Sequence, residues 1–112
     1  MSTSIEFNEF LARSGISLEM LHIADVGLSR RDALEAVKIL RRANLPILGG
    51  DVYFLRGDKL NVAIPNNWFT QPDPSEDSAS YFRRSWEKAE TYIENFPEPA
   101  DAEVLFSLVV KK

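Results

Sequence analysis

The sequence contains no cysteine, and this absence removes several kinds of chemistry at once. Disulfides, thiolate nucleophiles and the cysteine ligands of structural zinc are all excluded. A chain without disulfides fits a reducing compartment. The first ten residues, MSTSIEFNEF, contain acids and lack the apolar run of a signal peptide. We therefore expect a cytoplasmic protein.

Long hydrophobic runs and histidines are also scarce. The longest apolar run, VLFSLVV, is far shorter than the roughly 18 residues of a membrane helix and suits a buried strand. His22 is the only histidine, and no nucleophile-elbow pattern accompanies it. An ordinary surface or boundary position is therefore a simpler interpretation of His22 than a catalytic triad.

Neither the acidic nor the glycine-rich segments match a known metal or phosphate motif. Asp73, Glu76 and Asp77 are close together, but they lack the spacing and the glycine of an EF-hand loop. In LGGDVYF the expected helix precedes the glycines and the expected strand follows them, which is the reverse of a phosphate-binding loop. The tripeptide RGD falls at a turn, but nothing else indicates an adhesion protein. We expect no catalytic site, no metal and no cofactor.

Negative charge is concentrated in one segment. The chain has a formal net charge of −4, yet residues 1–70 hold 8 acids and 8 bases. Residues 71–103 hold 9 acids and 3 bases, which leaves 9 − 3 = 6 negative charges. Such a segment disfavours nucleic-acid binding and is compatible with a basic protein partner. Helical spacing places Glu87, Glu90 and Glu94 on one ridge, which is either a solvated face or part of a binding surface.

Glycine, proline and capping residues divide the 112 residues into the elements of a single domain, 1–112. We expect N-terminal helices within residues 1–45. Their predicted positions are about 5–13, 17–25 and 29–44, the last capped by Ser29.

The middle of the chain predicts a β-hairpin over residues 51–64. Gly57 and Asp58 form its two-residue turn, and glycine in the first turn position is typical of type II′. Pro65 cannot donate to a strand ladder and so marks the end of the second strand. The following NNWFTQPDP is either a loop or a short extra strand.

The C-terminal part predicts one long helix and one buried strand. Asp73 with Pro74 forms a strong helix start, so a helix is expected over 74–95. The apolar residues near the end predict a strand over 103–110. The whole pattern predicts an α+β fold of two layers, in which about four helices pack on a small, mostly antiparallel sheet.

Trp68 and Phe69 are adjacent aromatic residues in NNWF. Neighbouring side chains of an extended segment point in opposite directions, so one ring can lie in the core while the other is exposed. We expect at least one of them in the core. Large aromatic side chains are frequent binding hot spots, so the exposed one would be a candidate for partner contact.

The segments PILGGDVYFL, NNWF, YFRRSWEKAETYIENF and VLFSLVV together resemble the immunity protein 40 family in order and spacing. The resemblance covers roughly residues 29–110. Members are small bacterial proteins thought to neutralise toxins of polymorphic or contact-dependent systems. They often have a tyrosine or cysteine near the NW aromatic, where this chain has Phe69 and Thr70. The family-like positions are Gly49, Gly50, Asp51, Val52, Tyr53, Asn67, Trp68, Phe69, Arg84, Ser85, Tyr92 and Ile93.

This resemblance implies a stoichiometric inhibitor that binds a cognate toxin domain in the cytoplasm of a bacterium, without catalysis. The acidic segment suggests that the toxin is basic, such as a nuclease, and no nucleic-acid or membrane partner is expected. The candidate partner-binding residues are Asp51, Tyr53, Asn67, Trp68, Phe69, Glu76, Asp77, Arg84, Glu87, Glu90 and Glu94.

Two alternatives stay open from the sequence. A small adaptor or ligand-binding domain predicts a concave pocket near Asp51, Tyr53 and Trp68. An enzyme predicts that His22 or a pair of carboxylates lines a cleft with strongly shifted pKa values.

Overall fold

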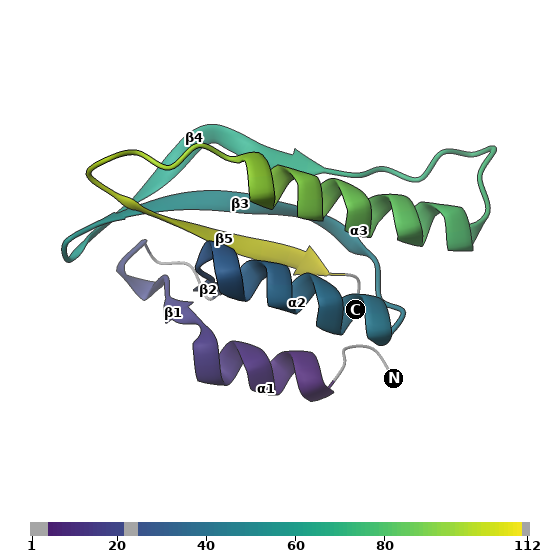
Figure 1. Cartoon of the computed structure of the whole chain (residues 1–112), viewed down its shortest axis with the longest axis horizontal. Helices are drawn as coiled ribbons and strands as arrows, with labels where there is room; N and C mark the ends of the chain where they lie inside the picture. The colour runs from purple at the N-terminus through teal and green to yellow at the C-terminus, as the bar shows by residue number, and fades with distance from the viewer. Residues whose placement is uncertain (1–4, 22–24, 111–112) are drawn as a thin grey trace.

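The computed structural model of the chain describes residues 5–21 and 25–110, with the backbone but not the side chains of 62–66. Helices and strands are interspersed along these residues (Figure 1). In chain order they are α1 (Ile5–Ser14), β1 (Ile16–Ser17), the 3₁₀ helix η1 (Glu19–Leu21), β2 (Val26–Gly27), α2 (Arg30–Arg42), β3 (Ile47–Arg56), β4 (Lys59–Phe69), α3 (Ser78–Asn95) and β5 (Glu103–Val110). The predicted α+β class is confirmed.

The main sheet consists of β3, β4 and β5, in the order β4-β3-β5, and both pairings are antiparallel. The predicted hairpin and C-terminal strand are therefore confirmed. Gly57 has a φ of +62°, and Asp58 does not share a positive φ, which is the pattern of the predicted type II′ turn. A second, smaller sheet pairs β1 with β2.

The hairpin is longer than the predicted range 51–64. Strand β3 already begins at Ile47, and β4 continues to Phe69. NNWF is therefore the last part of a sheet strand and not a loop.

The prediction that Pro65 ends the second strand is wrong. Asp51 pairs with Asn67 and Tyr53 pairs with Val62, so two steps along β3 correspond to five steps along β4. The extra β4 residues form a bulge, and Pro65 lies within it. A bulge on an edge strand is one of the few sheet positions that tolerate proline, because no ladder hydrogen bond is lost.

Helices α2 and α3 lie side by side on one face of the sheet, and α1 packs against α2 (Figure 1). The main core fills the space between the helices and this face. Its most deeply buried side chains include Leu28, Ala36, Leu40, Ile47, Val52, Ile93 and Phe106. Burial of these apolar surfaces is the main stabilisation of the two-layer arrangement.

Local hydrogen bonds mark both ends of helix α2, and the one at its start was predicted from the sequence. The hydroxyl of Ser29 accepts from the backbone N–H of Asp32, which confirms the predicted cap. At the other end Asn44 has a φ of 60°, and the N–H of Leu45 donates to the carbonyl of Leu40. This left-handed residue ends the helix before Pro46 is reached.

Two helix predictions need correction, which leaves three α-helices among the described residues instead of about four. Residues 17–25 do not form a helix in their described part, which contains β1, η1 and β2. The long helix begins at Ser78, because Asp77 and not Asp73 caps it. Asp73 instead accepts from the N–H of Ser75 in a separate turn.

The second face of the sheet is covered only in part. The described residues between β1 and β2 contribute to its cover, and Leu18 among them joins Tyr53, Leu60 and Leu105 in a small second core. Leu28, which follows β2, forms a bridge with Phe106 of β5 and anchors this segment. Beyond Tyr53, none of the helices and strands among the described residues covers the second face, and this part carries several of the candidate residues.

Candidate partner-binding surface

The open part of the second sheet face consists of two rows of residues across the three strands, and we call it the open sheet face. Strand pairing places Phe69, Gly49 and Val109 in the first row. It places Asn67, Asp51 and Ser107 in the second row. Phe69 is 61% exposed and Val109 is 45% exposed, so the first row presents two apolar side chains on either side of a glycine.

Asp51 lies at the centre of the open sheet face and is half-buried. Among the described residues, no hydrogen bond or ion pair engages its carboxylate. Ser107, its neighbour on β5, is buried and interacts instead with the hydroxyl of Tyr53. Burial raises the pKa of Tyr53 above its usual value, and the nearby carboxylates of Asp51 and Asp25 raise it further.

The two adjacent aromatic residues of NNWF point to opposite faces of β4. Trp68 is 5% exposed and belongs to the main core, which confirms that at least one of the two rings is internal. Its ring stacks on Tyr92 of α3 with centroids 4.6 Å apart. Gly50 leaves room for this ring, because a Cβ there would lie 2.2 Å from Cη2 of Trp68. Phe69 is consequently directed to the open sheet face.

The backbone that carries Phe69 is held by three side chains of α3. Nζ of Lys88 donates to the carbonyl of Phe69 at 2.8 Å. The hydroxyl of Tyr81 donates to the carbonyl of Thr70 at 2.7 Å, and Nη2 of Arg84 donates to the carbonyl of Gln71 at 2.7 Å. Three consecutive carbonyls are thus fixed to one helix.

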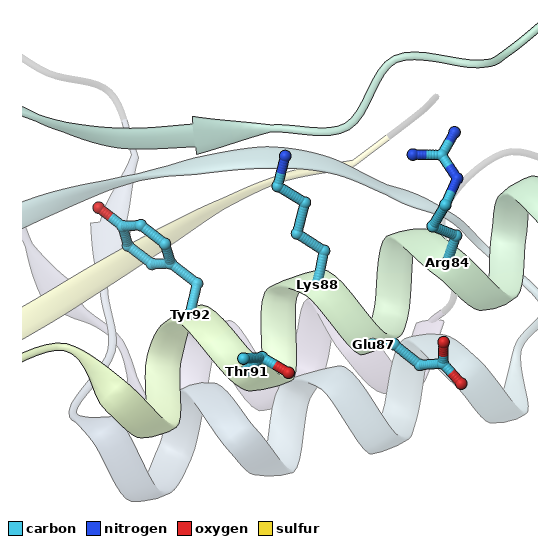
Figure 2. Close-up of a pocket in the computed structure, with 5 residues that line it drawn as sticks. All are labelled: Arg84, Glu87, Lys88, Thr91 and Tyr92. Carbon is cyan, nitrogen blue, oxygen red and sulfur yellow. The ribbon is translucent and has the colours of Figure 1, made fainter.

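The outer side of α3 carries a shallow groove. Figure 2 shows Arg84, Lys88 and Tyr92 pointing toward β4, whereas Glu87 and Thr91 point away from it. These residues line one hollow of about 420 Å³, and an adjoining hollow of about 440 Å³ shares Thr91 and Tyr92 and extends toward Pro97. Neither hollow includes Asp51, Tyr53 or Trp68, which the ligand-binding alternative would have placed in a pocket.

The cations of this groove already have partners inside the protein. Arg84 donates from Nε to Glu76 at 3.1 Å as well as to the chain near Gln71. The hydrogen bond from Arg84 holds the pKa of Glu76 below its usual value. Hydrogen bonding from the N–H of Ser80 likewise lowers the pKa of Asp77, the helix cap. Glu76 and Asp77 are therefore engaged in local structure.

The remaining acidic candidates lie on α3 itself. Glu87 and Glu94 are exposed, and Glu90 is half-buried. No ion pair within the described part of the chain involves any of the three carboxylates, so they form a negative ridge beside the groove.

The structure brings the eleven candidates into three places. Asp51, Asn67 and Phe69 share the open sheet face, whereas Tyr53 and Trp68 are buried in the two cores. The remaining six candidates, all charged, lie on α3 or in the loop before it. Val109 was not predicted as a surface residue. The run VLFSLVV is almost wholly apolar, so its sequence does not show that Val109 faces solvent.

Groups of side chains that could hold a metal ion are absent from residues 5–21 and 25–110. His22, the one histidine considered for catalysis, lies outside the described residues. The described helices also include none that is long and apolar enough to cross a membrane. At LGGDVYF, α2 precedes the glycines as predicted, but β3 begins before them and runs through them instead of following them.

Comparison with known proteins gave one finding. The family model of immunity protein 40 matches residues 17–110, which is most of the chain. Comparisons with curated proteins and with solved structures gave no match.

Proposed function

The chain belongs to the immunity protein 40 family, and on that premise we propose that it binds a cognate toxin domain stoichiometrically and neutralises it without catalysis. Family membership is the observation that carries this proposal. We place the complex in the cytoplasm of the bacterium that makes the toxin, and we propose a basic toxin domain, such as a nuclease.

The surface of the protein supports a binding role. Phe69 is an exposed aromatic residue on a backbone fixed by hydrogen bonds, and such anchors lose little conformational entropy on association. The negative ridge of Glu87, Glu90 and Glu94 suits a basic partner, because complementary charge speeds encounter and disfavours wrong partners.

A titration tests the stoichiometric inhibitor directly. The toxin domain encoded beside this chain's gene is assayed while the purified chain is added in increasing amounts. An inhibitor that acts by binding abolishes toxin activity at one equivalent, with a linear decline before that point. Co-expression should also rescue growth. A non-cognate toxin domain of the same activity is the control and should stay active.

Two results would contradict the proposal. A chain that fails to protect cells from the neighbouring toxin is not its immunity protein. Complete loss of toxin activity at far less than one equivalent would show turnover, and would favour an enzyme over an inhibitor.

The groove along α3 supports a second candidate, a small ligand-binding domain. A ligand that binds the folded chain raises its melting temperature. A thermal-shift screen therefore tests this candidate, and a hit should lose its effect in the variant Tyr92→Ala. No shift by any compound, together with toxin neutralisation, would reject it.

A further inference from the structure

We infer that the open sheet face, and not the outer side of α3, is the surface that contacts the toxin, with Phe69 inserted in an apolar pocket and a lysine or arginine of the toxin on Asp51. This inference rests on the proposed function, since it names the surface through which the neutralised toxin is held. The toxin surface that fits this face has an apolar hollow and, a short distance from it, a lysine or arginine side chain.

Phe69 provides the apolar anchor of the proposed contact. A ring that is 61% exposed at the end of a sheet strand buries little surface in the free protein and has much to bury in a complex. The N–H of Thr70 donates to the carbonyl of Leu48, in addition to the three hydrogen bonds from α3. The backbone under the ring is thereby set before binding. Val109 adds apolar surface across Gly49 in the same row.

Asp51 provides the charge. Aspartate is disfavoured in strands, and this one occupies the central strand β3 without an ion pair or hydrogen bond to its carboxylate among the described residues. Burial of an unpaired carboxylate is costly, so binding an uncharged surface here would be penalised, whereas a guanidinium or ammonium would satisfy it. Asp25 lies near the same Tyr53 hydroxyl and strengthens the negative potential. Charge complementarity therefore selects a cationic residue of the partner.

The outer side of α3 is less suited to be the contact surface. Its cations Arg84 and Lys88 are used in fixing residues 69–71, and Glu76 is paired with Arg84. Tyr92 is half-buried and stacked on Trp68, so little of its ring is left to bury. Glu87 and Glu94 of the ridge are exposed, and exposed charges affect the rate of association more than the strength of the complex.

The test compares matched variants in binding to the purified toxin domain encoded beside this chain's gene, measured by calorimetry. Phe69→Ala should weaken binding roughly 30-fold or more, as truncation of an aromatic anchor does. Asp51→Asn should weaken it roughly tenfold. Ile5→Ala is the apolar control, because Ile5 is 68% exposed on α1, and Glu9→Gln is the charge control, because Glu9 is also exposed on α1 and lies outside the ridge. Both controls should bind within about twofold of the wild type.

Hydrogen exchange of the wild-type complex gives a second readout that needs no variant. Amides around 49–51, 67–70 and 107–109 should become protected by the toxin, while those along α3 should not. Wild-type affinity in both Phe69→Ala and Asp51→Asn, or protection confined to α3, overturns the inference while leaving the proposed function intact. A wild-type chain that does not bind the toxin overturns both.

A second copy of the chain is the other occupant to consider. If the open sheet face is a dimer interface, light scattering will show a dimer that Phe69→Ala converts to a monomer. That result also overturns the inference. A monomer for both proteins, with toxin binding lost in the variant, supports it.

Discussion

The hydroxyl of Tyr81 donates a 2.7 Å hydrogen bond to the backbone carbonyl of Thr70, and both side chains are buried. This contact joins α3 to the residue that follows β4. The hydroxyl of Thr70 itself finds no hydrogen-bond partner among the described residues. The Tyr81 hydroxyl therefore stabilises the fold, whereas burial of the Thr70 hydroxyl destabilises it.

Tyr81→Phe should destabilise the fold by about 1–3 kcal/mol, because it leaves the buried carbonyl of Thr70 unsatisfied. The ring still fills its place, so the loss is due to the hydrogen bond alone. Thermal and urea unfolding measure it. Tyr92→Phe is the matched control, since no hydrogen bond of the Tyr92 hydroxyl is found in the described structure, and it should change stability by less than about 0.5 kcal/mol. Equal losses in both variants would contradict the role assigned to Tyr81.

Thr70→Val should stabilise the protein by about 1 kcal/mol. The valine has nearly the same shape, and it removes a buried hydroxyl that has no partner in the described structure. For a domain of this size the melting temperature should rise by about 4 °C. Thr91→Val in the exposed groove is the control and should leave the melting temperature nearly unchanged. A fall in the melting temperature of Thr70→Val would mean that the hydroxyl is satisfied in solution.

Local signals explain the parts of the fold that the sequence predicts well. The cap at Ser29 and the turn at Gly57 each depend on residues within four positions, so the sequence contains all the information they need. The prediction of a helix over 17–25 is wrong for the opposite reason, because contacts with distant residues matter more there than local signals. A helix that short is unstable alone, and in the described part of this segment Leu18 is instead buried beside Tyr53 and Leu105.

The candidate surface could be predicted only in part. The sequence predicts that the side chains of Trp68 and Phe69 point to opposite faces of the strand, but it does not show which of the two rings lies in the core. That choice depends on the register of β4, and a shift of one residue would exchange the two faces. The bulge around Pro65 sets this register, and no local pattern states how many residues it contains. The grouping of Asp51 with Val109 likewise depends on pairing of strands far apart in the sequence.

Gly50→Ala should destabilise the protein much more than Gly57→Ala. A Cβ at Gly50 would lie 2.2 Å from Cη2 of Trp68 and 2.5 Å from the carbonyl oxygen of Ser107, so the core must shift at a cost of about 3 kcal/mol. A Cβ at Gly57 meets nothing within 4 Å, and only its φ of +62° opposes the alanine, at about 1 kcal/mol. Chemical unfolding of the pair measures both. A larger loss at Gly57 would show that Trp68 does not pack over Gly50.

Asp77→Asn should make stability less sensitive to acid. Hydrogen bonding from Ser80 lowers the pKa of Asp77 in the folded chain below its unfolded value of about 3.9. Its stabilising effect is thus complete above that value and is lost as the pH falls through the lower, folded pKa. Asparagine still caps the helix but does not titrate. Unfolding free energies measured between neutral pH and pH 3 should therefore decline less in Asp77→Asn than in the wild type, and an equal decline would contradict the assignment.

Glu94→Lys should slow association with the toxin without shortening the life of the complex. Glu94 is exposed on the ridge of α3, outside the proposed contact surface, so its charge acts through the field that a basic partner meets on approach. Stopped-flow mixing at low ionic strength should show an association rate reduced by roughly threefold to tenfold, and the difference should vanish at high salt, where charges are screened. Glu9→Lys, an equal charge change on α1, should have a smaller effect because α1 packs mainly against α2, whereas Glu94 lies on α3 itself. If Glu94→Lys mainly accelerates dissociation, then α3 contacts the toxin directly and the division between a steering ridge and a docking sheet face is wrong.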